Sequence, residues 1–320
     1  MSALTLYEAS KVNAGDVKKS AVIEMFPRAS ELLAAMPFQS IDGGSLSYTL
    51  EGTLPGVAFR GYNEGYTAST GVLNPQTEVL RIAGGELDVD TAIIATRGEG
   101  TRESQEAMKI KSLALYLTSK FINGDSVADP REFDGLRTRI GGSQLFEAGG
   151  DNAYDSGYAA TAIQALSVGS ALDRAIDAVD DPTHLIMSKD MRRLLSRAVK
   201  STSVSGNIEW DKDDLGKRIA YYNDIPIITT DMDDTGAKII GFNEASPNAG
   251  STAASSMYVV NFGPNMVTGI QNDFMDVRDL GEIDASPVMR TRLEWLIGLA
   301  VQHGRSCSRI WGISNALPVV

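Results

Sequence analysis

A long glycine- and aromatic-rich segment between two stretches of alternating hydrophobicity constrains this fold most. Leu46, Tyr48 and Leu50 occupy every second position, the spacing that places side chains on one face of a β-strand. A second alternating stretch begins at Val79, and the sequence between the two, GTLPGVAFRGYNEGYTASTGVLNP, is too long for a tight turn. We therefore expect a long two-stranded excursion with a decorated tip. Because an isolated two-stranded ribbon is marginally stable in water, we expect a neighbouring subunit to support it.

The tip of this excursion carries the residues that we single out as a candidate interface. Phe59, Tyr62 and Tyr66 are interleaved with the charged residues Arg60 and Glu64. This mixture is typical of protein interfaces, although the same residues could pack locally within the hairpin. Because no second module lies nearby in the sequence to cover them, we favour a contact between subunits.

The clearest helix is predicted at residues 101–123. A buried stripe with helical spacing runs through Ile110, Leu113, Ala114, Leu117 and Phe121. We expect Thr101 to cap the N-terminus of this helix, and Asn123-Gly124 to end it. Between the ribbon and the helix, a strand through Leu87 and Val89 crosses Gly84-Gly85, which we interpret as a bulge or a bend.

The rest of the chain alternates helices and strands. Residues 125–160 are loop-like and indicate a domain boundary, and residues 161–200 predict a helix, a strand and a second helix capped by Ser188. A long strand is predicted at 286–302 because apolar residues recur at every second position from Met289 to Val301. Further strands are expected at 217–230, 237–242, 257–262 and 266–270. This order of elements predicts an α+β fold, with a second domain inserted before the last strand.

Composition excludes several classes of protein. The chain has 320 residues and a formal net charge of −12 with no basic stripe, which argues against a dedicated reader of DNA or RNA. Its one cysteine, Cys307, cannot form an intrachain disulfide. No secretory signal and no membrane-spanning stretch are found in the sequence, so we expect synthesis in the cytoplasm and no contact with a membrane.

No catalytic motif is found in the sequence, and no cofactor is expected. The best metal candidate is DMDDTG, in which Asp231 and Asp233 alternate as oxygen ligands and Gly236 stands sixth, as in half of a calcium loop. The twelfth position is Phe242 instead of a bidentate glutamate. We therefore interpret the segment as a turn, with a weak metal site as the alternative.

Three segments carry a resemblance to a known family. LPGVAFRGYNEGYTASTGVLNP is followed by GGELDVD, by the long amphipathic helix, and then by INGDSVADPREFDGL. The order of these segments resembles that of tailed-bacteriophage major capsid proteins with the Hong Kong 97 fold. The pieces Phe121–Asp125 and Phe133–Leu136 are the most specific, and the resemblance covers essentially the whole chain.

The resemblance implies a domain organisation. It implies an N-terminal arm, an extended hairpin called the E-loop, and a spine helix at 101–122 within a peripheral domain. An axial domain completes the fold. The ranges that follow are 1–38 for the arm, 39–85 for the E-loop, 86–154 with 281–320 for the peripheral domain, and 155–280 for the axial domain.

The resemblance also implies a function. Such chains assemble into pentamers and hexamers of an icosahedral virion capsid that encloses double-stranded DNA, with a scaffolding protein, a portal protein and a decoration protein as implied partners. Some members weld their subunits through an E-loop lysine, but this chain has no lysine between Lys19 and Lys109, so we expect a non-covalent shell. We further hypothesise that hinges at Gly84-Gly85 and at residues 98–100 let one sequence fit both rings.

Three rival interpretations remain open from sequence alone. An encapsulin, a protein nanocompartment of the same fold, would enclose an enzyme cargo in place of DNA. A small α+β enzyme would depend on a divalent ion at Asp231 and Asp233. A tail-tube or other virion protein would lack the long helix between the ribbon and the second domain.

Overall fold

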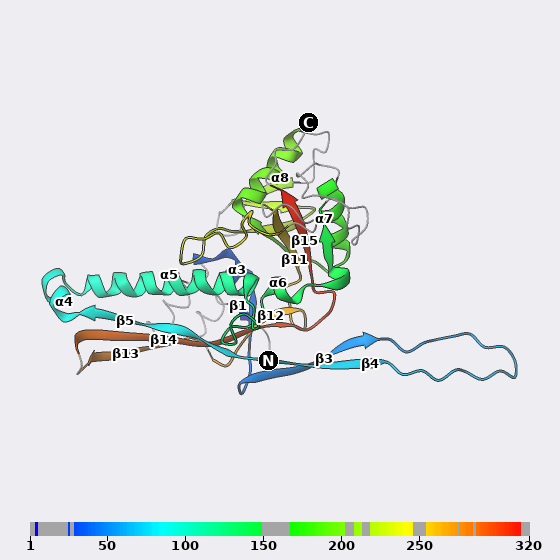
Figure 1. The fold of residues 1–320 in the computed structure, drawn as a ribbon, viewed down its shortest axis with the longest axis horizontal. Coiled ribbons are helices and arrows are strands. Elements are labelled where there is room, and N and C mark those ends of the chain that lie inside the picture. The colour runs from blue at the N-terminus through cyan, green and yellow to red at the C-terminus, as the bar shows by residue number, and fades with distance from the viewer. Residues whose placement is uncertain are drawn as a thin grey trace.

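The computed structural model describes residues 4–5, 25, 29–148, 167–201, 208–212, 218–245, 254–273, 275–283 and 286–314. These residues form an α+β fold with two sheets and a separate two-stranded ribbon. One sheet lies along a long helix, α5, and together they form a lobe at the left of Figure 1. The second sheet lies above the base of this lobe, and the ribbon extends to the right, away from both.

The six-stranded sheet is organised around one long strand. β14 (Ser286–Val301) pairs with β5 (Arg81–Asp90) on one edge and with β13 (Asp276–Ile283) on the other. The C-terminal end of β14 pairs with β12 (Val267–Gln271). The predicted strand at 286–302 is thus confirmed, since Leu293, Trp295 and Ile297 are buried on one face. The remaining strands of this sheet are β2 (Pro37–Ser40) and β1 (Leu4–Thr5).

The predicted helix at 101–123 is confirmed as α5 (Gly100–Asn123), and all five residues of its predicted stripe are buried. The predicted cap is wrong, because Glu99 occupies the capping position without a side-chain hydrogen bond and Thr101 lies inside the helix. A short helix, α4 (Thr91–Arg97), precedes α5, and the chain turns between them at Gly98, whose φ is +87°.

The end of α5 explains the two most specific sequence pieces. Gly124 follows α5, and the amide of Gly135 donates a hydrogen bond to the Gly124 carbonyl at 2.9 Å. A Cβ on Gly124 would lie 2.3 Å from the carbonyl oxygen of Phe133, so no larger residue fits there. The rings of Phe121 and Phe133 contact each other at a tilt of 47°, with centroids 4.9 Å apart. The two pieces therefore pack against each other and close the base of the helix.

The seven-stranded sheet forms the second unit. Its order is β6 (Leu145–Glu147), β15 (Cys307–Ser314), β11 (Ala254–Val260), β7 (His184–Ser188), β10 (Ile225–Thr230), β9 (Arg218–Tyr222) and β8 (Ile208–Lys212). Helices α7 (Ser167–Asp177) and α8 (Lys189–Ser201) flank it (Figure 1). The predicted cap of α8 is confirmed, because the amide of Met191 donates to the Ser188 hydroxyl at 3.2 Å.

Shorter segments join the two sheets. α6 (Leu136–Arg139) and a 3-10 turn (Gly142–Gln144) lead from the end of α5 to β6. α3 (Glu31–Ala35) places Leu32 and Leu33 in the chain's own core. Most of the expected arm at 1–38 lies outside the described residues, but its described end packs within this chain.

Several expectations differ from the structure. The strand predicted at 237–242 is wrong, because Lys238 makes only an isolated bridge with Met232. β13 and β15 were not predicted as separate strands. The sheets also divide the chain differently from the expected domain ranges, since β6 and β15 lie in the seven-stranded sheet while β12 and β13 lie in the other.

The interpretation of Gly84-Gly85 as a bulge or bend is also wrong, whereas the hinge hypothesised there stays a prediction. β5 runs straight through both glycines, with Gly84 opposite Glu294 and Gly85 opposite Leu293 in an unshifted register. A Cβ on Gly84 would lie 2.1 Å from the carbonyl oxygen of Leu293. These glycines therefore allow close contact with neighbouring elements within a regular strand. Across the described part of the chain, no helix is long and apolar enough to cross a membrane.

Candidate assembly surfaces

The ribbon is the most extended feature of the molecule. β3 (Ser45–Thr53) pairs antiparallel with β4 (Val72–Val79), and residues 54–71 form a long tip between them. In Figure 1 this tip is the part of the chain farthest from the two sheets. Leu46 near the base packs against a small buried cluster, whereas the ribbon beyond Leu50 is exposed along its length. The ribbon is thus anchored at one end only.

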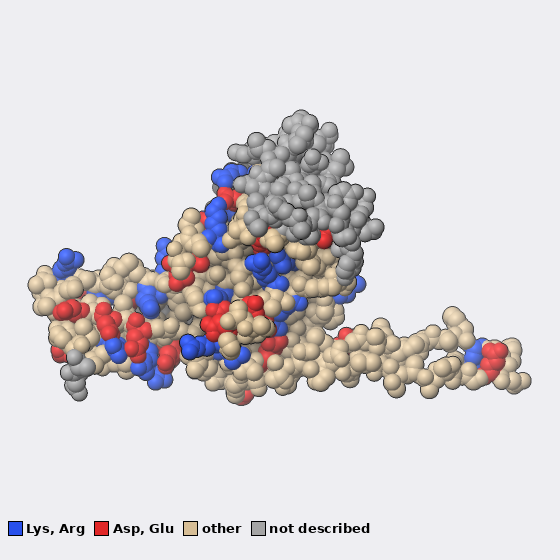
Figure 2. Space-filling view, in the orientation of Figure 1, with Lys and Arg blue, Asp and Glu red and all other residues tan. Residues whose placement is uncertain are grey.

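The tip presents apolar rings to solvent. Phe59 is 108% exposed and Tyr62 is 102% exposed, so neither ring packs within the hairpin. Figure 2 shows a largely uncharged shaft that ends in one basic and one acidic patch. Arg60 and Glu64 are the charged residues of the sequence between Glu51 and Glu78. Solvated apolar rings at the end of a projecting element are typical of a surface that becomes covered on association.

The charged residues of the tip hold its backbone. The amide of Gly61 donates to the Glu64 carboxylate at 2.8 Å, and Arg60 donates to the Glu64 carbonyl at 3.0 Å. The Arg60 guanidinium also lies 5.3 Å from the centroid of the Tyr66 ring. Three of the five predicted interface residues, Arg60, Glu64 and Tyr66, are therefore brought together, which leaves Phe59 and Tyr62 outward.

A polar cluster fixes the base of the ribbon to the body. Arg139 of α6 forms two hydrogen bonds with the Glu78 carboxylate of β4, at 2.5 and 2.6 Å. The Tyr48 hydroxyl of β3 lies 3.1 Å from Glu78 Oε1 and 2.9 Å from the carbonyl oxygen of Val301 in β14. Burial, followed by the charge of Glu78, raises the pKa of Tyr48 to about 12. Burial opposes the charge of Arg139, but the hydrogen bond to Glu78 and the charges of its neighbours together outweigh burial and raise the Arg139 pKa.

Sequence reasoning did not identify this cluster. Glu78 and Arg139 are 61 residues apart, and Tyr48 and Val301 are 253 apart. Tyr48 was recognised only as a member of an alternating strand. No sequence pattern near Tyr48 indicates which residues its hydroxyl group contacts.

The open face of the lobe carries a charged ladder. Arg290 of β14 binds Asp88 of β5 through two 2.6 Å hydrogen bonds, and Arg292 binds Glu86 next to it. In Figure 2 acidic and basic side chains alternate along this lobe at the left. Ile82 and Leu296 are paired across the same strands and are both exposed. The charged side chains of this face thus form ion pairs with one another, and a small apolar patch lies beside them.

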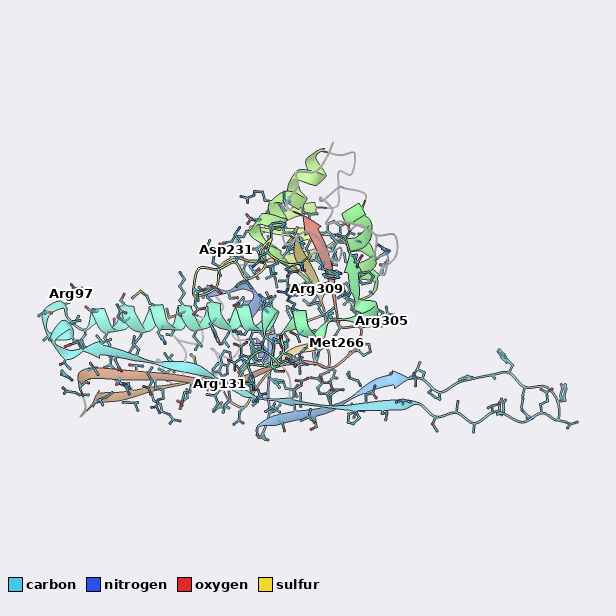
Figure 3. The ribbon with its side chains drawn as sticks, in the orientation of Figure 1. Arg97, Arg131, Asp231, Met266, Arg305 and Arg309 are labelled. Carbon is cyan, nitrogen blue, oxygen red and sulfur yellow. The ribbon has the colours of Figure 1, made fainter. Side chains whose placement is uncertain are left out.

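The candidate metal residues have partners within the chain. Asp231, labelled in Figure 3 on the body away from the ribbon, forms a 2.7 Å ion pair with Lys189. The Asp233 carboxylate accepts hydrogen bonds from Thr235 and from the amide of Ala237, and the bond from Thr235 is the main cause of its lowered pKa. Within the described ranges no group of three or more His, Cys, Asp or Glu side chains is placed to hold a metal. The segment forms a turn.

Cys307 does not offer a reactive thiol. It is buried at the start of β15, and this burial raises its pKa to about 11. Because the thiolate is the nucleophilic form, the side chain stays protonated and unreactive at neutral pH.

Comparison with known proteins provides the class. Residues 14–167 match the family described as Major capsid protein GP7, a range that includes the ribbon and α5. No curated protein sequence matches the chain.

Solved structures similar to this chain include an encapsulin and a capsid. The holo-SrpI encapsulin complex from Synechococcus elongatus has a TM-score of 0.63 at 13% identity, over 91% of this chain and 89% of that chain. The capsid of a native GTA particle has a TM-score of 0.59 at 13% identity, over 89% and 90%. Mycobacterium phage Bobi gives a TM-score of 0.57 at 12% identity, over 88% and 89%.

These likenesses establish that the chain has the Hong Kong 97 fold, the architecture of shell-forming proteins. The match over residues 14–167 adds a likeness to major capsid proteins in the part of the chain that holds the ribbon and α5. The predicted fold class and the resemblance stated from sequence are both confirmed.

Proposed function

We propose that this chain assembles with copies of itself into pentamers and hexamers of an icosahedral shell that encloses the double-stranded DNA of a tailed phage. The observation that carries the proposal is the ribbon tip, where Phe59 and Tyr62 are fully exposed at the end of a long element anchored at one end. In this role the protein is structural and catalyses no reaction.

The contact between copies would be head-to-tail. The ribbon and the lobe of α5 extend in opposite directions from the body in Figure 1, so one copy presents different surfaces at its two ends. Such heterologous contacts close into rings when the rotation between copies permits. The interface residues that we propose on the ribbon are Phe59, Arg60, Tyr62, Glu64 and Tyr66.

The ribbon corresponds, in this proposal, to the E-loop. The six-stranded sheet with α5 would be the peripheral domain, and the seven-stranded sheet would be the axial domain. Residues 1–38 would act as the arm. Since the sequence has no lysine between Lys19 and Lys109, the ribbon supplies no amine for a covalent weld, and we propose a shell held by non-covalent contacts.

The partners follow from the same role. A net charge of −12 suits a container whose wall does not adhere tightly to DNA. We propose that the shell assembles in the host cytoplasm with a scaffolding protein and a portal protein, and that a decoration protein binds the finished virion capsid.

Electron microscopy and sedimentation of the purified chain test this proposal. We expect closed shells, or rings of five and six subunits, from the unaltered chain. The paired change Phe59→Ser and Tyr62→Ser should abolish them, because it removes the apolar contact at the tip. Val127→Ser is the matched control, since Val127 is 88% exposed on the body. A homogeneous particle of one to four subunits under several salt and pH conditions would overturn the proposal.

An encapsulin shell is the second candidate. The encapsulin complex has a TM-score of 0.63, above the 0.59 and 0.57 of the GTA and phage capsids. Ultraviolet absorbance and mass spectrometry of shells isolated from their native source distinguish the two candidates. Packaged nucleic acid would support the phage capsid, whereas a single abundant enzyme inside the shell would support the nanocompartment.

A further inference from the structure

We propose that Glu78, Arg139 and Tyr48 are positioning residues that set the direction in which the ribbon projects from the body. The inference rests on the proposed function in one respect, because ribbon direction decides where the tip meets the next copy. Glu78 binds both Arg139 and Tyr48 within its own chain. All three residues act through the ribbon, whose far end carries Phe59 and Tyr62.

Each strand of the ribbon has its own polar tie to the body. Glu78 ties β4 to α6 through the two-bonded contact with Arg139, and Arg139 Nε also donates to the carbonyl oxygen of Asp134 at 2.8 Å. Tyr48 ties β3 to the end of β14 through the Val301 carbonyl oxygen. Because both strands of the ribbon are held, the ribbon resists rotation about its base more than it would with one strand held.

The ties are sheltered from water. The side chains of Arg139 and Glu78 are 15% and 17% exposed, so their attraction is screened less than that of a surface pair. The planar guanidinium binds both carboxylate oxygens at once, which constrains orientation as well as distance. Because Tyr48 contacts the same carboxylate at 3.1 Å, the cluster is one connected network.

Apolar packing of the ribbon is confined to its base, where Leu46 contacts a small buried cluster. A cavity of about 310 Å³ separates the ribbon from the body, lined by Leu50 and Gln76 from the ribbon and by Gly141 and Gln144 from the body. Beyond Leu50 the ribbon is exposed. A ribbon with space beneath it can swing unless its polar ties hold it.

The length of the ribbon amplifies any movement at its base. A strand rises about 3.3 Å per residue, so residue 62 lies roughly 45 Å along the ribbon from Tyr48. A rotation of about 10° at the base would therefore displace the tip by roughly 8 Å. That displacement exceeds the reach of a side-chain contact, so an altered base would misplace the tip.

The experiment measures tip position in the full chain. Thr67→Cys on the tip and Val127→Cys on the body carry spin labels, and Cys307→Ser removes the remaining thiol. Pulsed dipolar spectroscopy then gives the distance distribution between the labels. We expect Glu78→Gln to broaden it and to shift its mean, by roughly 8 Å for each ~10° of rotation at the base. Asp88→Asn is the matched control, since it breaks the Arg290 pair on the lobe and leaves the ribbon base intact.

Two milder variants separate positioning from folding. Tyr48→Phe removes only a hydroxyl, and Arg139→Lys keeps the charge but cannot bind both oxygens; each should broaden the distribution with an unchanged melting temperature. Unchanged distributions in all three variants would overturn the inference. The proposed function fails separately: if the tip variants still form shells, the interface is elsewhere, whatever the ribbon direction.

Discussion

α5 and the β3–β4 ribbon are the two longest projections of the molecule, and they extend in opposite directions (Figure 1). α5 packs against β5 of its own chain, and Ile110, Leu113 and Leu117 lie in one buried cluster with Leu293 and Trp295 of β14. The ribbon beyond Leu50 has no such cover. A projecting element is stabilised either by packing inside its own chain or by contact with a partner. The ribbon beyond Leu50 has no packing inside its own chain, so we expect a partner to cover it.

Both projections are nevertheless anchored by a partly buried arginine. Arg102 near the start of α5 binds Asp279 at 2.6 Å and the Thr291 hydroxyl at 3.0 Å, as Arg139 binds Glu78 at the ribbon base. α5 is held by these polar contacts and also by a buried apolar stripe. Most of the ribbon is exposed and is held only through the polar contacts at its base. The following predictions test that contrast, from the largest expected effect to the smallest.

The largest expected difference in stability is between Phe121 in α5 and Phe59 at the ribbon tip. Phe121→Ala should lower the free energy of unfolding by about 3–5 kcal/mol, because the ring is 1% exposed and packs between Phe38 and Phe133. Phe59→Ala should change it by less than about 0.5 kcal/mol, because the ring is solvated. Urea unfolding of the unassembled subunit measures both. Similar losses at the two sites would mean that the tip packs within its own subunit.

Gly84 in β5 and Gly65 at the ribbon tip allow the same comparison for close backbone contacts. Gly84→Ala should cost about 1–3 kcal/mol in unfolding free energy, because its Cβ would press on the Leu293 carbonyl in β14. Gly65→Ala at the tip should change that energy by no more than about 1 kcal/mol, since nothing lies within 4 Å of its Cβ. If Gly84→Ala had no effect on thermal or urea unfolding, the sheet would be looser there, as a hinge requires.

The ribbon base should lose stability at high pH. Tyr48 titrates near pH 12 in the folded chain, above the ordinary tyrosine value of 10. The folded state thus holds the proton more tightly, so this stabilisation is fully present below pH 10 and is lost as pH rises towards 12. Tyr48→Phe should decline less over this window, which urea unfolding between pH 9 and 12 can measure. Parallel declines would show that Tyr48 is not buried at the base.

The mildest test leaves the chain unaltered. Trypsin should cut the unassembled subunit first at Arg60, because the tip is exposed, and more slowly at Arg102 or Arg139, which lie in ordered, partly buried sites. Assembled shells should be protected at Arg60. Mass spectrometry of timed digests gives both rates. Equal cleavage at Arg60 in shells and subunits would place the tip outside any interface.

The reach of sequence reasoning also differs between the two regions. The α5 stripe and the alternation of β14 were predicted because each depends on spacing within one segment. β15 was not predicted as a separate strand, and its membership of the seven-stranded sheet depends on pairing with β11 and β6. The bulge at Gly84-Gly85 was predicted wrongly because the reason for Gly84 lies on another strand.

The candidate surfaces divide in the same way. The five tip residues were found from composition, and the structure shows that Phe59 and Tyr62 are exposed. Their role as an interface stays a prediction. The Glu78–Arg139–Tyr48 cluster was missed, since its members come from separate parts of the chain.

By itself, the sequence determined the α+β class, the long helix, the long C-terminal strand and the ribbon, because each depends on the periodicity of neighbouring residues. Only the tertiary structure decided which strands share a sheet, why Gly84 and Gly124 must be glycine, and how the ribbon is tied to the body. Those features depend on atoms that meet across long sequence separations, and such contacts leave no periodic trace in the sequence.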